Sequence, residues 1–355
     1  MKDRSRWEPD LLGEGFVRRT VVLSPDEEGE VVTTVVAHIP SEDPAMPTFL
    51  RRLGREPVDG TPAFAFLAIH GWNDYFYQVE LARAVSAMGG AFYAVDLRKY
   101  GRSLLGHQTF GYIRDLADYD EELHVCADLI YGEHGHGMPL VVYGHSTGGL
   151  IAALWADRHP GALGGLVLNA PWIEYHGSTI ARQIGTPVVD ILARLSPTAV
   201  IPTSTNDFYQ RSITAWEPDE TPWPPTGADP DDPFWSGGWS PDPAFRTPTG
   251  APVRPGWLSA ILAGHAKVSA GLAIDCPILV LTSARSITGD TWSEDFRAAD
   301  CVLDVGQIWK RVPDLGAHTT LVKLRDAVHD VTFSRRSVRE SAFREIERFV
   351  ATYVL

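Results

Sequence analysis

Short apolar runs alternate with helical stretches over the region from Phe64 to Leu168. Continuous apolar strands that are separated by helices are typical of a parallel sheet with helices on both faces. The alternation returns with apolar runs at 277–281 and 319–323 and ends in a helical stretch near 337–353. The sequence therefore predicts an α/β fold with a mostly parallel, doubly wound sheet. In the first region we expect strands at 64–69, 92–95, 140–143 and 165–168, and helices near 78–88, 115–130 and 147–158.

Two β-branched runs precede this region. Residues 16–23 and 31–38 flank the turn-rich stretch SPDEEGE, and this pattern predicts an antiparallel hairpin. Residues 40–62 are polar and rich in proline, so we expect a loop between the hairpin and the first parallel strand.

The alternation stops after Pro171 for about a hundred residues. Within this part, the 42 residues 216–257 hold 11 of the 26 prolines and 5 of the 11 tryptophans. Disordered linkers are poor in aromatic residues, and five tryptophans need surfaces to pack on. The sequence favours an ordered cap at 172–273, inserted into one catalytic domain made of 1–171 and 274–355; a mobile loop is the alternative.

Composition excludes several classes of protein. The net charge of −14 repels nucleic-acid phosphates and anionic lipid surfaces, so we expect neither a nucleic-acid partner nor a polybasic membrane anchor. Three scattered cysteines without a CxxC pair do not suit a disulfide framework. The stretch MKDRSRWEPDLL lacks the apolar core of a signal peptide, and no apolar run reaches the about 18 residues of a membrane span. We expect a soluble cytoplasmic protein, and the sequence carries no signature of its oligomeric state.

The sharpest motif is GHSTG at 144–148, which lies between the strand-like run LVVY and the helical run LIAALWADR. A G-x-S-x-G motif between a strand and a helix is typical of a nucleophile elbow, where a strained turn projects the serine above the sheet. The glycines on either side remove side chains that would collide there. The motif predicts Ser146 as a nucleophile, and the backbone N–H of Thr147, at the start of the helix, as a donor to the developing oxyanion.

A serine nucleophile needs a base and an acid that orients the base. In the hydrolase order the histidine comes last, after the final strand, and His329 has that place, whereas His318 precedes the strand. His134 and His136 lie with Glu133 in a short Gly-rich loop that is more simply a turn than a metal site. The acid belongs beyond the strand at 277–281, where several carboxylates qualify: Asp290, Glu294, Asp295, Asp300 and Asp304.

Four motifs together resemble the α/β-hydrolase branch of monoglyceride lipases, lysophospholipases and serine-aminopeptidase-like hydrolases. They are HGWND at 70–74, DLRKYGRS at 96–103, GHSTGG at 144–149 and HD at 329–330. The resemblance implies that the acid begins a D-x-V-x-D-like stretch, which matches 300–304, so it implies Asp300 as the acid with Asp304 next. It also implies the backbone N–H of Trp72 as the second oxyanion donor.

The chain departs from this pattern between the strand and the acid, where 16 residues, 284–299, replace a short turn. This insertion is expected to place Trp292 and Phe296 near the pocket. In the loop after the second parallel strand, Arg98 and Arg102 are expected to brace the loop by pairing with Asp96 rather than to bind substrate. His70 is expected to be a structural hydrogen-bonding residue.

These observations predict a serine hydrolase without cofactor or metal. Its expected substrate is a small-molecule carboxylic ester with an apolar acyl group, such as a monoacylglycerol or a lysophospholipid, cleaved through an acyl-enzyme. A peptidase or amidase with the same residues is one alternative, because acidic residues between Glu217 and Asp232 could bind a substrate amino group. A non-catalytic binding protein with the hydrolase fold is an alternative of another class.

Overall fold

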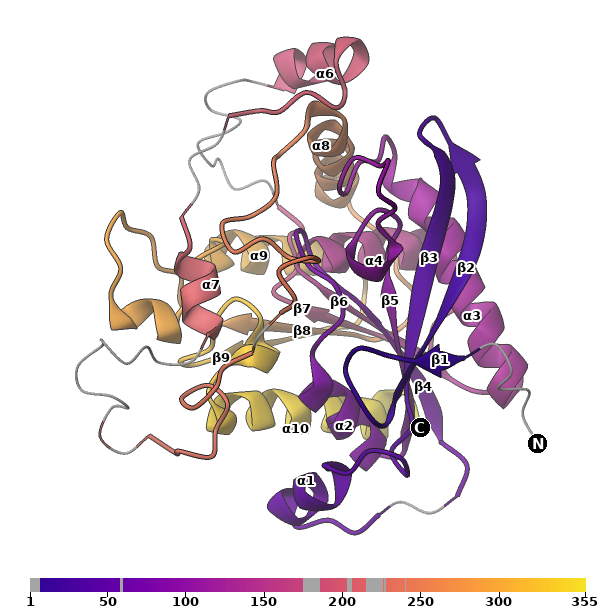
Figure 1. Ribbon diagram of the computed structural model, residues 1–355, viewed down its shortest axis with the longest axis vertical. Coiled ribbons are helices and arrows are strands. Elements are labelled where there is room, and N and C mark those ends of the chain that lie inside the picture. The colour runs from indigo at the N-terminus through magenta and orange to yellow at the C-terminus, as the bar shows by residue number, and fades with distance from the viewer. Residues whose placement is uncertain are drawn as a thin grey trace.

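The computed structural model describes residues 7–57, 60–174, 186–202, 206–214, 226, 228–239 and 241–355. These residues form a nine-stranded sheet in the order β1-β2-β3-β5-β4-β6-β7-β8-β9 (Figure 1). The pairings on the β1 side, up to β3 with β5, are antiparallel, and those from β5 to β9 are parallel. The strands are β1 Glu8–Pro9, β2 Phe16–Asp26, β3 Gly29–His38, β4 Phe64–Ile69, β5 Gly90–Asp96, β6 Leu140–His145, β7 Gly165–Asn169, β8 Ile278–Ser283 and β9 Thr319–Leu324.

Helices cover both faces of the sheet. Helices α3, α4, α8 and α9 share one apolar core with the sheet, and α1, α2 and α10 share the other. Strand β4 illustrates the division, since Leu67 faces the first core and Phe66 faces the second. The described helices are α1 Met46–Leu53, α2 Val79–Ala87, α3 Asp120–His134, α4 Thr147–Arg158, α6 Thr186–Leu195, α7 Phe208–Ile213, α8 Pro255–Ser269, α9 Val305–Arg311 and α10 Arg336–Tyr353. The doubly wound α/β prediction and the N-terminal hairpin are confirmed.

Helix α1 corrects the expectation of a loop at 40–62. Its proline, Pro47, lies in the first turn, where a missing N–H removes no helical hydrogen bond. Phe49 and Leu50 are buried against the second core, and Gly54 ends the helix in the left-handed conformation with φ of 66°. Burial of this apolar face outweighs the polar composition of the segment.

The chain between β7 and β8 contributes helices rather than strands among its described residues. Helix α8 packs against α4 within the first core, whereas α6 lies at the outer end of the molecule (Figure 1). Phe234 and Trp239 are buried in a third cluster with Tyr75, Tyr77 and Phe333. Two of the five tryptophans counted above, Trp216 and Trp223, lie outside the described residues.

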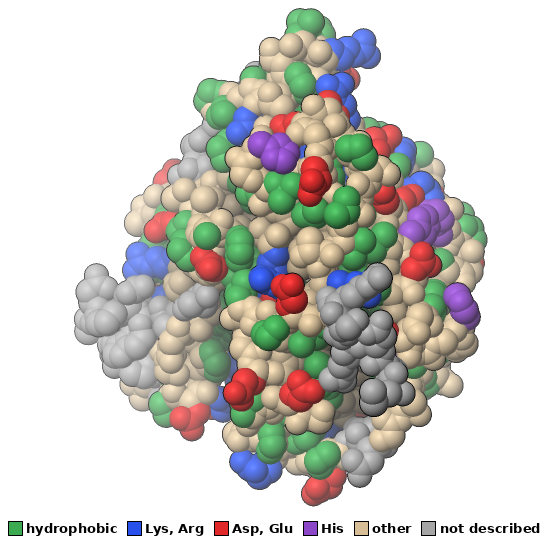
Figure 2. All heavy atoms as spheres, turned by 45° about the vertical axis from the view of Figure 1, so that its right-hand side comes forward, with side chains coloured by type: hydrophobic (Ala, Val, Ile, Leu, Met, Phe, Trp, Pro, Cys, Tyr) green, Lys and Arg blue, Asp and Glu red, His purple; other side chains and the backbone are tan. Residues whose placement is uncertain are grey.

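Charge is distributed over the surface. On the face shown in Figure 2, described acidic side chains lie interspersed with basic ones. Much of the acidic stretch 217–232 lies outside the described residues. Of its described members, Asp229 pairs with Arg336, and Asp232 pairs with Arg339 of α10 at 2.7 Å. Within the described part of the chain, no helix combines the length and the hydropathy that crossing a bilayer requires.

Candidate active site

Ser146 occupies a strained turn between β6 and α4. Its backbone has φ of 53° and ψ of −116°, a conformation that is costly for a residue with a side chain and that marks functional turns. A Cβ at Gly144 would lie 2.4 Å from the carbonyl oxygen of Gly148, and one at Gly148 would lie 2.3 Å from that of His70. Both glycines are therefore required for the turn to pass this close to its neighbours.

The loop after β4 lies against this turn. A Cβ at Gly71 would lie 3.0 Å from the Cβ of Ser146, so the backbone of Gly71 and Trp72 passes beside the serine. On its other side, Thr147 begins α4. The first N–H groups of a helix have no intrahelical acceptor and are available to an anion. Trp72 and Thr147, the two residues expected to donate to an oxyanion, therefore line the same cavity as Ser146.

His329 follows β9 and is hydrogen-bonded to Asp300. Its Nδ1 lies 2.9 Å from Asp300 Oδ2, and both side chains are buried. Asp300 Oδ1 also accepts the backbone N–H groups of Val302 and Leu303 at 2.9 and 2.8 Å. Burial alone would raise the pKa of the Asp300 carboxyl, but His329 and these N–H groups hold the pKa below its ordinary value.

The other four carboxylates considered as the acid are exposed. Asp304 is the N-cap of α9, where its side chain accepts the N–H of Gly306 at 2.9 Å. Its carboxylate is therefore engaged in helix capping, and Asp300 is the one of the five that contacts His329.

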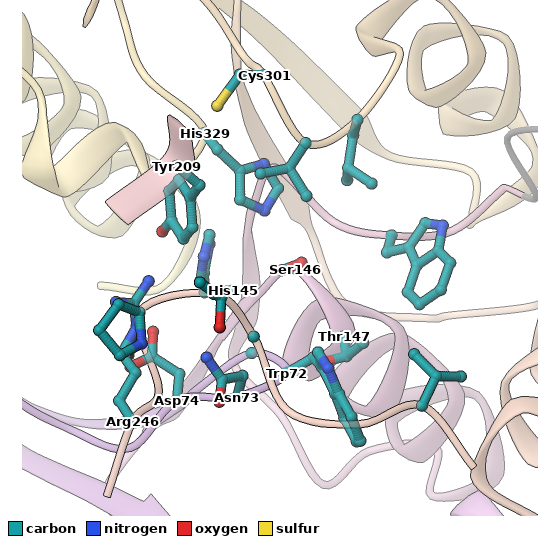
Figure 3. Close-up of a pocket in the computed structure, with 18 of the residues that line it drawn as sticks. Trp72, Asn73, Asp74, His145, Ser146, Thr147, Tyr209, Arg246, Cys301 and His329 are labelled. Carbon is teal, nitrogen blue, oxygen red and sulfur yellow. Dashed lines mark ion pairs between the residues drawn. The ribbon is translucent and has the colours of Figure 1, made fainter. Parts of the chain in front are cut away.

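Ser146 and His329 line the same cavity, which has a volume of about 370 Å³, and they face each other in Figure 3. Apolar side chains dominate one part of the wall. The rings of Trp72 and Trp257 lie 3.8 Å apart between centroids, and Trp172 lies 6.0 Å from Trp257. Together with Val253, Leu258, Val302 and Leu303 these rings form an apolar lining.

Trp292 and Phe296 do not belong to this lining, contrary to the expectation from the sequence. Their rings stack on each other at 5.5 Å and contact Phe208 of α7 at 5.9 and 4.9 Å, respectively. Arg211 of the same helix lies over the Trp292 ring at 4.6 Å. Trp292 and Phe296 therefore pack against α7 and not against the cavity.

A polar part of the wall was not predicted. Asp74 and Arg246 both line the cavity, with 3.6 Å between their charged groups (Figure 3). Burial raises the pKa of Asp74 to about 7, although the charge of Arg246 opposes the rise. Asp74 follows a strand end within a motif that the sequence does show, so its position could have signalled a site; Arg246, 172 residues away, has no such signal.

A buried polar network lies beneath His329. Asp330 accepts hydrogen bonds from Asn169 Nδ2 at 2.7 Å and from the N–H and hydroxyl of Thr332 at 2.9 and 2.6 Å. Burial lowers the pKa of His145 to about 4 despite the nearby Asp330 carboxylate, so His145 is neutral at neutral pH. The network holds the loop that carries His329 in place.

The residues expected to brace the loop after β5 are buried and bonded. Arg102 pairs with Asp96 at 2.8 Å, as expected, and with Asp10 at 2.7 Å. Arg98 is a correction, since it pairs with Glu122 of α3 at 2.7 Å and not with Asp96. The reason is the position of α3, whose Glu122 accepts hydrogen bonds from both the backbone N–H and the guanidinium of Arg98.

His70, Glu133 and His134 have structural partners, and Glu133 and His134 lie in the last turn of α3 rather than in the expected turn. His70 Nε2 accepts the N–H of Leu97 at 3.1 Å, and its Nδ1 donates to the carbonyl of Gly71 at 2.8 Å. Glu133 and His134 both bond to the hydroxyl of Tyr93, at 3.0 and 2.8 Å. Among the described residues, no cluster of three or more His, Cys, Asp or Glu side chains is arranged to hold a metal ion.

Part of the chain is similar to known protein families and structures. Residues 60–218 match the family described as serine aminopeptidase, S33. A monoacylglycerol lipase from Mycolicibacterium smegmatis is 28% identical over 140 residues, which cover 39% of this chain and 48% of that protein. The match thus spans about half the length of this relative.

Solved structures share the fold. A soluble variant of monoglyceride lipase from Saccharomyces cerevisiae, in complex with a substrate analog, superposes with a TM-score of 0.59 at 16% identity, covering 98% of this chain and 95% of that one. A thermostable carboxyl esterase from Bacillus coagulans, in complex with glycerol, gives 0.58 at 15% identity, covering 95% and 99%. The strained serine turn, the partial family match and the shared fold agree: the chain has the α/β-hydrolase fold and is similar to the branch that contains the monoglyceride lipases and serine aminopeptidases.

Proposed function

We propose that the protein is a serine hydrolase of carboxylic esters, with Ser146 as nucleophile, His329 as general base and Asp300 as the acid. One observation carries the proposal: a buried, hydrogen-bonded Asp300–His329 pair faces a serine on a strained turn across an apolar cavity. Burial of a charged group is costly unless it is paired and hydrogen-bonded, and a buried carboxylate whose pKa is shifted by a specific partner at a cavity marks a candidate functional site.

The reaction follows from the roles of these groups. Asp300 accepts the Nδ1–H of His329, which leaves Nε2 free to take the proton of Ser146 as the hydroxyl attacks the ester carbonyl. The backbone N–H groups of Trp72 and Thr147 stabilise the oxyanion of the tetrahedral intermediate. His329 then gives its proton to the leaving alcohol, and the acyl group stays on Ser146. Water, deprotonated by the same histidine, releases the acid.

We propose an apolar acyl ester as the substrate, such as a monoacylglycerol or a lysophospholipid. The tryptophan-rich lining offers an acyl chain an apolar surface, while Asp74 and Arg246 offer polar contacts at another part of the wall. Residues 172–273 are proposed as the cap that supplies much of this lining, since Trp172, Arg246 and Trp257 fall within them.

Ser146→Ala tests the proposal. The variant should lose nearly all turnover of short- and medium-chain p-nitrophenyl esters and monoacylglycerols while it keeps the melting temperature of the wild type. A fluorophosphonate probe should label the wild type and label neither Ser146→Ala nor His329→Ala. Turnover like that of the wild type in a pure Ser146→Ala preparation would contradict the mechanism, and an unlabelled wild-type protein would favour a non-catalytic binding role.

A peptidase activity is the second candidate, because the matching family is described as serine aminopeptidase. Two of the acidic residues that could bind a substrate amino group, Asp229 and Asp232, are paired with Arg336 and Arg339. We therefore expect cleavage of an ester and no comparable cleavage of the amide with the same acyl group. Faster hydrolysis of aminoacyl anilides than of the matching esters would reverse this assignment.

A further inference from the structure

Consecutive residues of the loop after β4 bind residues of the segment 241–250, which we call the strap. The carboxamide of Asn73 is bonded in both directions to one strap residue, Thr247. Asn73 Nδ2 donates to the carbonyl oxygen of Thr247 at 2.7 Å, and Asn73 Oδ1 accepts the hydroxyl of Thr247 at 2.9 Å and its N–H at 3.3 Å. A side chain bonded in this way has one orientation.

The next two residues of the loop extend the contact. Asp74 pairs with Arg246, whose side chain is buried. The hydroxyl of Tyr75 accepts the backbone N–H of Asp242 at 2.7 Å, and the Tyr75 ring contacts that of Phe245 edge to face at 5.2 Å. The strap therefore follows the loop residue by residue.

Asn73 has a backbone that depends on such support. Its φ is 59°, in the left-handed region that side-chain-bearing residues rarely occupy and that Asn tolerates best. Asn73 also follows Trp72 directly, and Gly71 lies against Ser146. A change in the backbone of Asn73 therefore moves the N–H of Trp72 relative to the serine.

The strap is preceded by a segment that is fixed to the body of the protein. Arg339 of α10 is fully buried between Asp232, at 2.7 Å, and Glu80 of α2. The ring of Trp239 packs on Phe333 at 5.2 Å. Thr247 thus belongs to a part of the insertion that is tied to the sheet and its helices, and it can serve as a fixed reference for the loop.

We propose that Thr247 and Asn73 are positioning residues for the oxyanion site: Thr247 holds the Asn73 carboxamide, and Asn73 holds the N–H of Trp72 where the oxyanion forms. This inference rests on the proposed ester hydrolysis. A role in substrate binding does not account for Thr247, because it is exposed and is not part of the cavity lining, whereas Asn73 is.

Thr247→Val is the sharpest test, because it removes one hydrogen bond without changing the side-chain shape or the cavity wall. We expect kcat for a p-nitrophenyl ester to fall about 3- to 10-fold with KM within about twofold, since a small displacement of a catalytic donor costs up to ~10²-fold and its loss ~10²- to 10³-fold. Thr247→Ser should restore kcat. Thr320→Val, on the exposed face of the edge strand β9, is the matched control and should change neither constant.

Two further variants act on the other partner. Asn73→Gly keeps the left-handed backbone accessible and removes the carboxamide, so we expect a loss in kcat of about 10- to 100-fold. Asn73→Asp keeps the acceptor oxygen for Thr247 and loses the donor, and it should be less impaired than Asn73→Gly. These variants keep the inference testable if Thr247→Val does not fold.

A pair of inhibitors separates positioning from a general effect on structure. A trifluoromethyl ketone adds to the serine and forms an oxyanion, whereas the methyl ketone with the same chain binds without addition. In Thr247→Val the Ki of the trifluoromethyl ketone should rise by the factor by which kcat/KM falls, and the Ki of the methyl ketone should stay constant.

Wild-type kcat in both Thr247→Val and Asn73→Gly, or an equal rise in both inhibition constants, would overturn the inference. Ser146→Ala distinguishes this failure from that of the proposed function. If Ser146→Ala is inactive and the other variants are unaffected, the positioning role alone is wrong; if Ser146→Ala is active, the proposed function fails first.

Discussion

Asparagine at position 300 would keep the shape of the side chain and reverse one of its hydrogen bonds. In the structure, Asp300 Oδ1 accepts two backbone N–H groups at 2.9 and 2.8 Å, and Oδ2 meets His329 Nδ1 at 2.9 Å. An Asn side chain satisfies the backbone donors only by turning its amide oxygen to them, which points its NH₂ group at Nδ1. Nδ1 must then accept, so the ring proton moves to Nε2.

That tautomer cannot take the proton of Ser146. In a triad of this kind the wrong tautomer lowers kcat ~10⁴-fold, which corresponds to about 5 kcal/mol of activation free energy. The opposite amide orientation is also unfavourable, because it would leave the N–H groups of Val302 and Leu303 facing an NH₂ group. A buried unpaired N–H such as that of Leu303 costs about 1–3 kcal/mol. Asp300→Asn should therefore fold and be nearly inactive.

The assay is kcat for a p-nitrophenyl ester between pH 6 and 9, with thermal unfolding to verify the fold. Asp304→Asn is the matched control: Asp304 is exposed and caps α9, so this variant should lose a little stability and keep its turnover. If Asp300→Asn retained more than a tenth of the wild-type kcat while Asp304→Asn lost a hundredfold, the assignment of the acid would be refuted.

Three more predictions address the pocket wall, the serine turn and the packing of the insertion. Burial raises the pKa of Asp74 to about 7, so ionisation of this carboxyl destabilises the folded state increasingly between the unfolded pKa and pH 7. The melting temperature of Asp74→Asn relative to that of the wild type should therefore rise between about pH 4 and 7. A difference that does not change with pH would contradict the raised pKa. Gly148→Ala would put a Cβ 2.3 Å from the carbonyl oxygen of His70, and we expect loss of soluble expression or of activity; an active, fully stable variant would show that the turn can relax. Arg339→Met removes a cation that two buried carboxylates share and leaves Glu80 with Arg52 and Asp232 with the backbone N–H of Arg336. This should destabilise the protein by about 3–5 kcal/mol in chemical unfolding, and a change below 1 kcal/mol would contradict the assigned pairing.

Local patterns predicted most of the α/β part of the fold. The strands and helices from 64 to 168 follow from apolar runs of the right length, and the hairpin follows from β-branched runs around a turn. Helix α1 was missed because residues 40–62 are polar and rich in proline as a whole, although its three buried residues, Met46, Phe49 and Leu50, have helical spacing. Local patterns also could not give the sheet order, in which β3 lies beside β5, because strand pairing is decided by contacts distant in sequence.

The residues of the site also fall into two groups, those that a local sequence pattern predicts and those that it does not. Ser146 and His329 were predictable because each has a local signature, a turn motif or a place after the last strand, and their roles remain predictions. Asp300 stood among five carboxylates and was chosen by resemblance. The pairing of Asp74 with Arg246 had no signal, because the two residues meet only through the course of the insertion. The same holds for Arg98, whose partner Glu122 lies one helix away.

The long connection between β8 and the proposed acid does not displace Asp300, because the connection is closed at its base. The N–H of Asp300 donates to the carbonyl of Arg285 at 3.0 Å, and the N–H of Ile287 donates to the carbonyl of Asp300 at 2.8 Å. Ser286 adds a hydrogen bond from its hydroxyl to the carbonyl of Leu303 at 2.7 Å. These bonds place the acid as a short turn would.

The residues of the insertion between these hydrogen bonds contact α7. Trp292 and Phe296 pack on Phe208 of α7, and Arg297 donates to the carbonyl of Thr214 at 2.7 Å just beyond that helix. The insertion at 284–299 therefore contacts the longer insertion at 172–273 and supports it. Because the support lies outside the closed base, the insertion at 284–299 can hold α7 without moving the carboxylate that orients His329.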